Sequence, residues 1–186
     1  GELVTVKDEW GTPVDAEKLS AALAANPETK IVAMVHAETS TGVCSDVKTL
    51  CALAKKHNCL TIVDSVTGLA GVPLEVDAWQ VDVAYSGTQK CLSAPPGISL
   101  ITFSEAAAEC VRARNAPVQS WFLDVSLLMA YWEGEGARTY HHTAPVNAMY
   151  GLHEALLMVQ EQGLEQSWQK HRDMLASFAE NLTGLG

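Results

Sequence analysis

The sequence is poor in positive charge. Its 186 residues include 12 lysines and arginines against 22 aspartates and glutamates, which gives a formal net charge of -10. Non-specific nucleic-acid binding depends on clustered cations, and the sequence contains no run of them, so we expect no nucleic-acid partner. It also lacks the run of roughly 18 apolar residues of a membrane-spanning helix and the features of a secretory signal. We therefore expect no membrane partner and a cytoplasmic location.

Cysteines with metal-binding spacing are missing as well. No CxxC pattern occurs, and no cysteine pair stands at zinc-finger spacing to a pair of histidines. His141 and His142 are adjacent and would diverge on a regular helix or strand, so we expect no shared metal site. The cysteines are odd in number and irregularly spaced, which predicts free thiols in a reducing compartment. They are Cys44, Cys51, Cys59, Cys91 and Cys110.

Short apolar runs alternate with amphipathic segments along the chain. Helical spacing with capping and stop residues predicts helices over 15–25, 46–57, 105 onward, 146–162 and 164–182. Apolar runs predict strands over 2–6, 31–35, 59–63, 81–86 and 98–104. Long connections between successive strands favour right-handed parallel crossovers. The predicted fold class is therefore α/β, a mainly parallel sheet flanked by helices, in one domain or at most two.

Two further features concern burial. The run over 31–35 is continuously apolar, as expected of a buried parallel strand. The stretch over 114–143 has no regular pattern but is aromatic, and we expect Trp121 and Phe122 to be core or interface residues.

Polar segments follow three of the predicted strands directly. They are HAETSTG after 31–35, DSVTG after 59–63 and SGTQK after the strand that begins at 81. In open parallel sheets, ligands bind beyond the carboxyl ends of the strands. These three segments are therefore the candidate site, although ordinary surface loops have a similar composition.

Asp64 and Lys90 are the two candidate reactive residues in these segments. Asp64 ends an apolar strand, where it is either a turn residue or a carboxylate that orients an imidazole, holds a metal or pairs with a protonated cofactor nitrogen. Most lysines are solvated, but Lys90 has uncharged neighbours. Weakly polar surroundings would lower its pKa and make it a nucleophilic amine.

Together, these two residues match what a pyridoxal phosphate enzyme needs. The lysine bonds to the cofactor aldehyde, and the aspartate keeps the pyridine nitrogen protonated so that the ring accepts electrons. Spacing alone does not distinguish this arrangement from a turn aspartate and a solvated lysine.

Longer motifs carry a resemblance to a known family. The stretches VHAETSTGV, IVDSVTGLAGVPLEVD, YSGTQKCLSAPPGISLITFS and RTYHHTAPVNAMYGLHEAL resemble the class V aminotransferases, and within them the alanine–glyoxylate and serine–glyoxylate aminotransferases. The resemblance covers nearly the whole chain. It implies the large domain of a type I pyridoxal-phosphate-dependent transferase, with pyridoxal 5'-phosphate as cofactor and a homodimer with shared active sites.

The resemblance also implies a role for each matching residue. Lys90 matches the catalytic lysine that binds the cofactor and moves the substrate proton, and Asp64 matches the partner of the ring nitrogen. The other matches concern cofactor binding. They are Val66 under the ring, Thr39 near the ring hydroxyl, Gln89 at the phosphate, and Tyr140 and Thr143 at the phosphate of the neighbouring subunit's cofactor.

The family pattern includes parts that these residues do not match. We expect residues 1–186 to be a partial cofactor-binding large domain, without the N-terminal phosphate-loop segment and without the C-terminal small domain that carries the substrate-binding arginine. Arg138 does not match that arginine. An isolated polypeptide of this kind is expected to have little transaminase activity, since positioning supplies much of catalysis.

The implied reaction transfers the amino group of alanine or serine to glyoxylate, giving glycine and a 2-oxo acid. The alternatives are class V transaminases of the 3-hydroxykynurenine, ureidoglycine–glyoxylate or aspartate type, or a non-catalytic dimerisation domain. Cysteine desulfurases share the fold, but none of the five cysteines matches their catalytic loop cysteine. Peroxisomal and mitochondrial family members make those compartments the alternatives to the cytoplasm.

Overall fold

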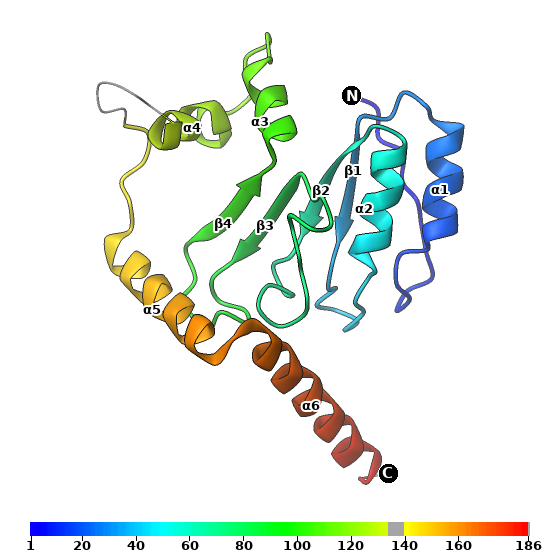
Figure 1. The fold of residues 1–186 in the computed structure, drawn as a ribbon, viewed down its shortest axis with the longest axis vertical. Coiled ribbons are helices and arrows are strands. Elements are labelled where there is room, and N and C mark those ends of the chain that lie inside the picture. The colour runs from blue at the N-terminus through cyan, green and yellow to red at the C-terminus, as the bar shows by residue number, and fades with distance from the viewer. Residues whose placement is uncertain (134–139, 186) are drawn as a thin grey trace.

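The structure, a computed structural model, describes residues 1–133 and 140–185, so Arg138 lies outside the described residues. A four-stranded sheet forms its centre (Figure 1). The strands are β1 (Ile31–Val35), β2 (Leu60–Asp64), β3 (Val83–Gly87) and β4 (Ser99–Phe103). The helices are α1 (Ala16–Ala25), α2 (Val47–Lys56), α3 (Glu105–Arg112), the short 3-10 helix η1 (Trp121–Leu123), α4 (Val125–Glu133), α5 (Val146–Gln162) and α6 (Leu164–Thr183).

The sheet confirms the predicted mainly parallel α/β class. Its order is β1-β2-β3-β4; β1, β2 and β3 are parallel, and β4 is antiparallel to β3. A parallel pair needs a crossover connection of about a dozen residues or more, usually with a helix. The segment 88–98 between β3 and β4 contains no helix. The chain therefore turns back, and β4 pairs in the opposite direction.

Helices α1 and α2 cover one face of the sheet (Figure 1). Asp46 begins α2, because its carboxylate accepts a hydrogen bond from the backbone N–H of Thr49 at 3.1 Å. Asn58 follows α2 with a φ of 55°, a left-handed conformation that asparagine adopts readily at a helix end. The buried residues of α2 lie on one face at helical spacing, and they are Val47, Leu50, Cys51 and Ala54.

Two expectations about strands are wrong. Residues 2–6 are not a strand, and Leu3 is 86% exposed. Their β-forming composition is insufficient because a strand also needs a partner for its backbone N–H and C=O groups. The strand β1 forms as predicted but lies at the sheet edge, where Ile31 and Val35 are 53% and 38% exposed.

The segment over 114–143 contains η1 and α4, which its irregular pattern does not indicate. Trp121 and Phe122 are more than 60% exposed, so they are not core residues of this chain. The rings of His141 and His142 do not diverge as expected, and their centroids are 4.0 Å apart. The two residues lie outside any helix or strand, so the geometry that would separate adjacent side chains does not apply. His141 also contacts Trp121, with centroids 4.0 Å apart.

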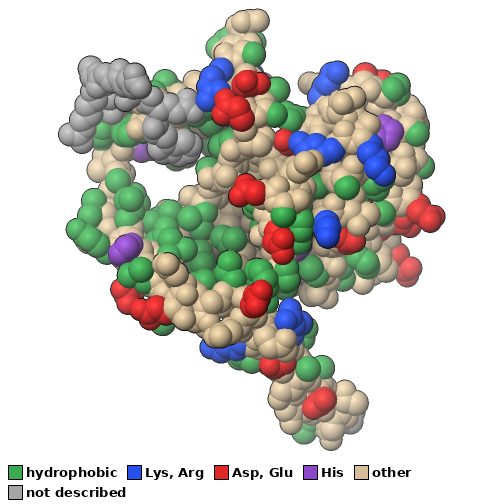
Figure 2. Space-filling view, viewed as in Figure 1, with side chains coloured by type: hydrophobic (Ala, Val, Ile, Leu, Met, Phe, Trp, Pro, Cys, Tyr) green, Lys and Arg blue, Asp and Glu red, His purple; other side chains and the backbone are tan. Residues whose placement is uncertain are grey.

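Helices α5 and α6 end the chain at the lengths that the sequence predicts. α6 projects away from the sheet and is fixed near its start by a 2.7 Å hydrogen bond from Ser167 Oγ to the Ala70 carbonyl (Figure 1). Hydrophobic side chains gather over α5 and the neighbouring part of the sheet (Figure 2).

Within the described ranges, no helix combines the length and apolarity needed to cross a membrane. All five cysteines are free thiols.

Candidate active site

The three polar segments singled out in the sequence lie at one edge of the sheet. They follow β1, β2 and β3, and the parallel pairing brings the carboxyl ends of these strands together. Side chains join the three loops. Thr39 Oγ1 and Thr67 Oγ1 are 2.5 Å apart, which links the first loop to the second. Cys91 Sγ donates to the Thr67 carbonyl at 3.2 Å, which links the third loop to the second.

Asp64 ends β2 with both carboxylate oxygens hydrogen-bonded. Oδ1 accepts from the backbone N–H of Val66 at 2.9 Å, and Oδ2 accepts from the hydroxyl of Tyr85 at 2.8 Å. The hydrogen bond to Asp64, followed by burial, raises the pKa of Tyr85. Sequence reasoning missed Tyr85, although its place near the end of a strand next to that of Asp64 is a signal that could have found it.

Lys90 lies in the loop after β3, which is anchored on both sides. The fully buried Thr88 donates from Oγ1 to the carbonyl of Pro95 at 2.6 Å. The backbone N–H of Ser93 donates to the Lys90 carbonyl at 2.9 Å, closing a turn in which Ser93 has a φ of 55°. The side chain of Lys90 is exposed, so this chain does not enclose the amine as its uncharged sequence neighbours led us to expect.

The loop after β3 also places Gln89 in an exposed position, while Val66 in the loop after β2 is half-buried. Five of the predicted site residues therefore lie on the three joined loops, namely Thr39, Asp64, Val66, Gln89 and Lys90. The structure does not place Tyr140 and Thr143 there. They lie on the segment between α4 and α5, where their hydroxyls are hydrogen-bonded to each other.

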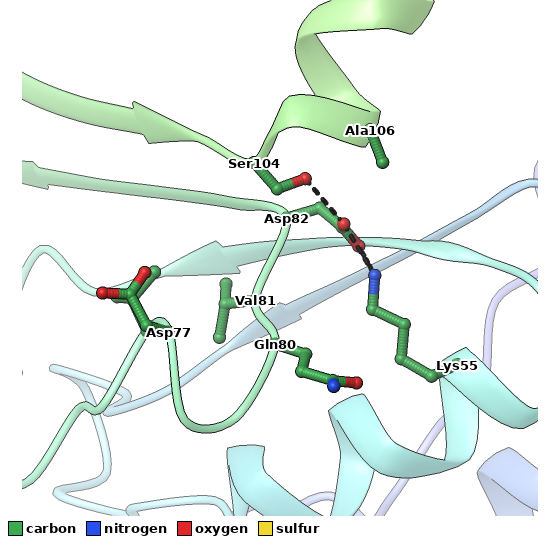
Figure 3. A pocket seen from close by; sticks show the side chains of 8 residues that line it. Lys55, Asp77, Gln80, Val81, Asp82, Ser104 and Ala106 are labelled. Carbon is green, nitrogen blue, oxygen red and sulfur yellow. Dashed lines mark hydrogen bonds and ion pairs between the residues drawn. The ribbon is translucent and has the colours of Figure 1, made fainter.

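A second polar cluster, missed in the sequence, lies at the opposite end of β3. Asp82 is 1% exposed and immediately precedes that strand. Lys55 Nζ lies 2.6 Å from both Asp82 carboxylate oxygens, and Ser104 Oγ donates to one of them at 2.8 Å (Figure 3). The Thr61 N–H donates to the other oxygen at 2.8 Å. Burial alone would raise the pKa of Asp82, but these hydrogen bonds outweigh it and lower that pKa.

The hollow beside this cluster is not the candidate site. It is lined by the charged pair Lys55 and Asp82 together with Asp77, Gln80 and Val81 (Figure 3). Lys55 and Asp82 bind each other, and the hollow lies at the amino end of β3, whereas Lys90 follows the carboxyl end. The cluster around Asp82 accordingly has a structural role, because it links α2, β2 and the end of β4. The candidate site lies at the other edge of the sheet.

The residues at the carboxyl edge fit a pyridoxal-type cofactor. Asp64 offers a carboxylate for a protonated ring nitrogen, Lys90 an exposed amine for an aldehyde, and Thr39 a hydroxyl for the ring oxygen. Metal binding has no comparable donor set: within 1–133 and 140–185, no three His, Cys, Asp or Glu residues come together in a way that could hold an ion.

The mainly parallel sheet and its flanking helices match part of the pyridoxal-phosphate-dependent aminotransferase fold. The family described as Aminotransferase class-V matches residues 3–186. The chain belongs to the class V aminotransferase family.

Individual relatives agree with this assignment. Alanine–glyoxylate aminotransferase of Oryctolagus cuniculus is 44% identical over 154 residues, which cover 82% of this chain and 39% of that relative. The structure of alanine–glyoxylate aminotransferase from Nostoc sp. matches with a TM-score of 0.91 and 41% identity, covering 97% of this chain and 47% of the other. Ureidoglycine–glyoxylate aminotransferase from Bacillus subtilis matches with a TM-score of 0.88 and 40% identity, covering 94% and 44%. The chain thus spans less than half the length of these relatives.

Proposed function

We propose that this chain is the cofactor-binding part of a pyridoxal-phosphate-dependent transaminase that transfers the amino group of alanine or serine to glyoxylate, giving glycine and a 2-oxo acid. The observation that carries the proposal is the placement of Lys90 and Asp64 on joined loops at one sheet edge. The names of the relatives supply alanine and glyoxylate, and the resemblance of the motifs supplies serine. Pyridoxal phosphate, when bound, supplies an electron sink for the negative charge left when the substrate loses its α-proton.

Each predicted residue has one task in this proposal. Lys90 carries the proton between the substrate α-carbon and the cofactor, and it is the catalytic residue. Asp64 holds the ring nitrogen in its protonated form, and Val66 supports the ring. Thr39 binds the ring hydroxyl. Gln89 binds the phosphate.

Tyr140 and Thr143 enter the proposal through a second copy of the chain. Because they lie away from the three loops, we propose that they bind the phosphate held by the partner subunit of a homodimer. The exposed apolar side chains near this segment support a subunit interface there: Trp121 and Phe122 are 61% and 62% exposed. Five free thiols favour a reducing compartment, so we propose a cytoplasmic location.

A ureidoglycine–glyoxylate transaminase is the second candidate function. It is favoured by the Bacillus subtilis structure, whose TM-score of 0.88 is close to that of the Nostoc enzyme. Both reactions use the same cofactor and glyoxylate. A panel of alanine, serine and ureidoglycine as amino donors, with glyoxylate as acceptor, separates the two functions on the natural full-length protein.

Lys90→Ala tests the proposed cofactor chemistry. Pyridoxal phosphate added to the natural full-length protein should give the visible absorbance of lysine-bound cofactor, and the variant should not show it. Because Lys90 is exposed, its replacement should change the free energy of unfolding by less than about 0.5 kcal/mol. Lys48→Ala, on the exposed face of α2, is the matched control and should keep the absorbance. An absorbance unchanged in Lys90→Ala would refute the assignment.

A further inference from the structure

Tyr85 and Asp64 are direct neighbours across the pair of strands that leads into the site. They are register partners in the parallel pairing of β2 with β3, so their side chains lie on the same face of the sheet. That face is opposite to the one that buries Val63 and Ala84 against α1 and α2. The Tyr85 hydroxyl reaches Asp64 Oδ2 at 2.8 Å, a normal length for a hydrogen bond to a carboxylate.

The backbone around this pair is tied together. The Tyr85 carbonyl accepts hydrogen bonds from both the N–H and the Oγ of Ser65, at 2.9 and 2.7 Å. Ser86 Oγ in turn donates to the Ser65 carbonyl at 3.1 Å. The residue after Asp64 is thus bonded to Tyr85 and to its neighbour, which fixes the distance between the tyrosine ring and the carboxylate.

The Tyr85 hydroxyl also remains a hydrogen-bond donor to Asp64. Its pKa is raised, first by the hydrogen bond to Asp64, so the hydroxyl keeps its proton at neutral pH and can donate it to that hydrogen bond. An ionised carboxylate has about four lone-pair sites. Val66 N–H and Tyr85 O–H occupy one on each oxygen, which leaves sites free for a further donor.

We propose that Tyr85 is a positioning residue for the proposed cofactor site: its hydroxyl fixes the rotation of the Asp64 carboxylate so that a free lone pair faces the protonated ring nitrogen of the cofactor. The inference rests on the proposed function of Asp64. Without the hydroxyl, the Val66 N–H is the one hydrogen-bond donor to the carboxylate among the residues that the structure describes, and the carboxylate can rotate about its terminal bond. Removing a partner that orients a metal ligand in this way typically costs 10- to 100-fold in affinity or activity, and we expect an effect of the same order for a carboxylate that binds a ring nitrogen.

The test uses Tyr85→Phe in the natural full-length protein with pyridoxal 5'-phosphate labelled with 15N in the ring. We expect the dissociation constant of the cofactor to rise about tenfold and the ring 15N resonance to move toward its unprotonated position. Tyr150→Phe removes the same hydroxyl from an exposed position on α5 and should change neither quantity. Tyr85→Met is a second variant without the hydroxyl and should give the same two changes if the phenylalanine variant folds poorly.

A double-substitution cycle separates positioning from a general structural effect. In an Asp64→Asn background, Tyr85→Phe should cause no further change, because the tyrosine acts through the carboxylate. Unchanged affinity and resonance in Tyr85→Phe, or an equal change in the Asp64→Asn background, would overturn the role of Tyr85 while Lys90-dependent absorbance persists. Absence of that absorbance from the unsubstituted protein would instead overturn the proposed function, and the role of Tyr85 with it.

Discussion

Gly71 touches the loop that carries Lys90, and its replacement by alanine is a sensitive test of that packing. A Cβ added at Gly71 would lie 2.5 Å from Cys91 Sγ. Carbon-sized atoms pack at about 3.5–4.0 Å, so the new atom overlaps the sulfur by about 1 Å. Cys91 must move, and its hydrogen bond to the Thr67 carbonyl is lost. Overpacking of this kind costs about 1–3 kcal/mol.

The expected loss in the free energy of unfolding for Gly71→Ala is therefore about 1–3 kcal/mol, measured by urea titration followed by circular dichroism. Cys91→Ala removes the sulfur and leaves its Cβ 3.4 Å from the added atom. In that background Gly71→Ala should cost less than about 0.5 kcal/mol.

The cycle has a matched control in Gly151→Ala. There the nearest atom is Pro95 Cδ at 3.6 Å, an ordinary contact, and helix propensity should stabilise α5 by up to about 1 kcal/mol. An equal cost of Gly71→Ala with and without the Cys91 sulfur would refute the reasoning, because the sulfur could not then be the obstacle.

Two further predictions concern buried titratable side chains. Asp82→Ala should lower the free energy of unfolding by about 3–5 kcal/mol, because it leaves Lys55, Thr61 and Ser104 without their shared acceptor. Asp77→Ala, on the rim of the same hollow, is the control. An equal loss of stability in Asp77→Ala would contradict the role of Asp82. Burial lowers the pKa of His36 in the folded protein, so the unfolded chain binds a proton more readily than the folded one. The free energy of unfolding should therefore fall as the pH drops below about 6.5, the ordinary pKa of histidine, toward the lowered pKa of the folded state. His36→Gln should flatten this dependence in urea titrations at pH 5 to 8, and an unchanged slope would show that His36 does not cause it.

Local signals account for the features that the sequence predicts correctly. The buried face of α2 follows from helical spacing, its start from Asp46 and its left-handed end from Asn58. The site residues Asp64 and Lys90 are found because each directly follows an apolar run, and parallel strands place such positions at one edge.

The missed features depend on partners far apart in the sequence. Tyr85 reaches Asp64 across 21 residues, and Asp82 is bonded to Lys55 across 27. Strand register and helix packing bring these atoms together, and neither can be predicted from the composition of a short segment. The failure of residues 2–6 to form a strand has the same origin, since a strand is defined by the neighbour with which it pairs.

The cluster around Asp82 and the loops that carry Lys90 lie at opposite ends of the same strand. Replacing an exposed loop residue such as Lys90 leaves the hydrogen bonds of the buried Asp82 untouched, so it should remove cofactor binding with little loss of stability. A substitution at Asp82 instead leaves several groups without their acceptor at once. Binding and stability can therefore be perturbed separately, from the two ends of one short strand.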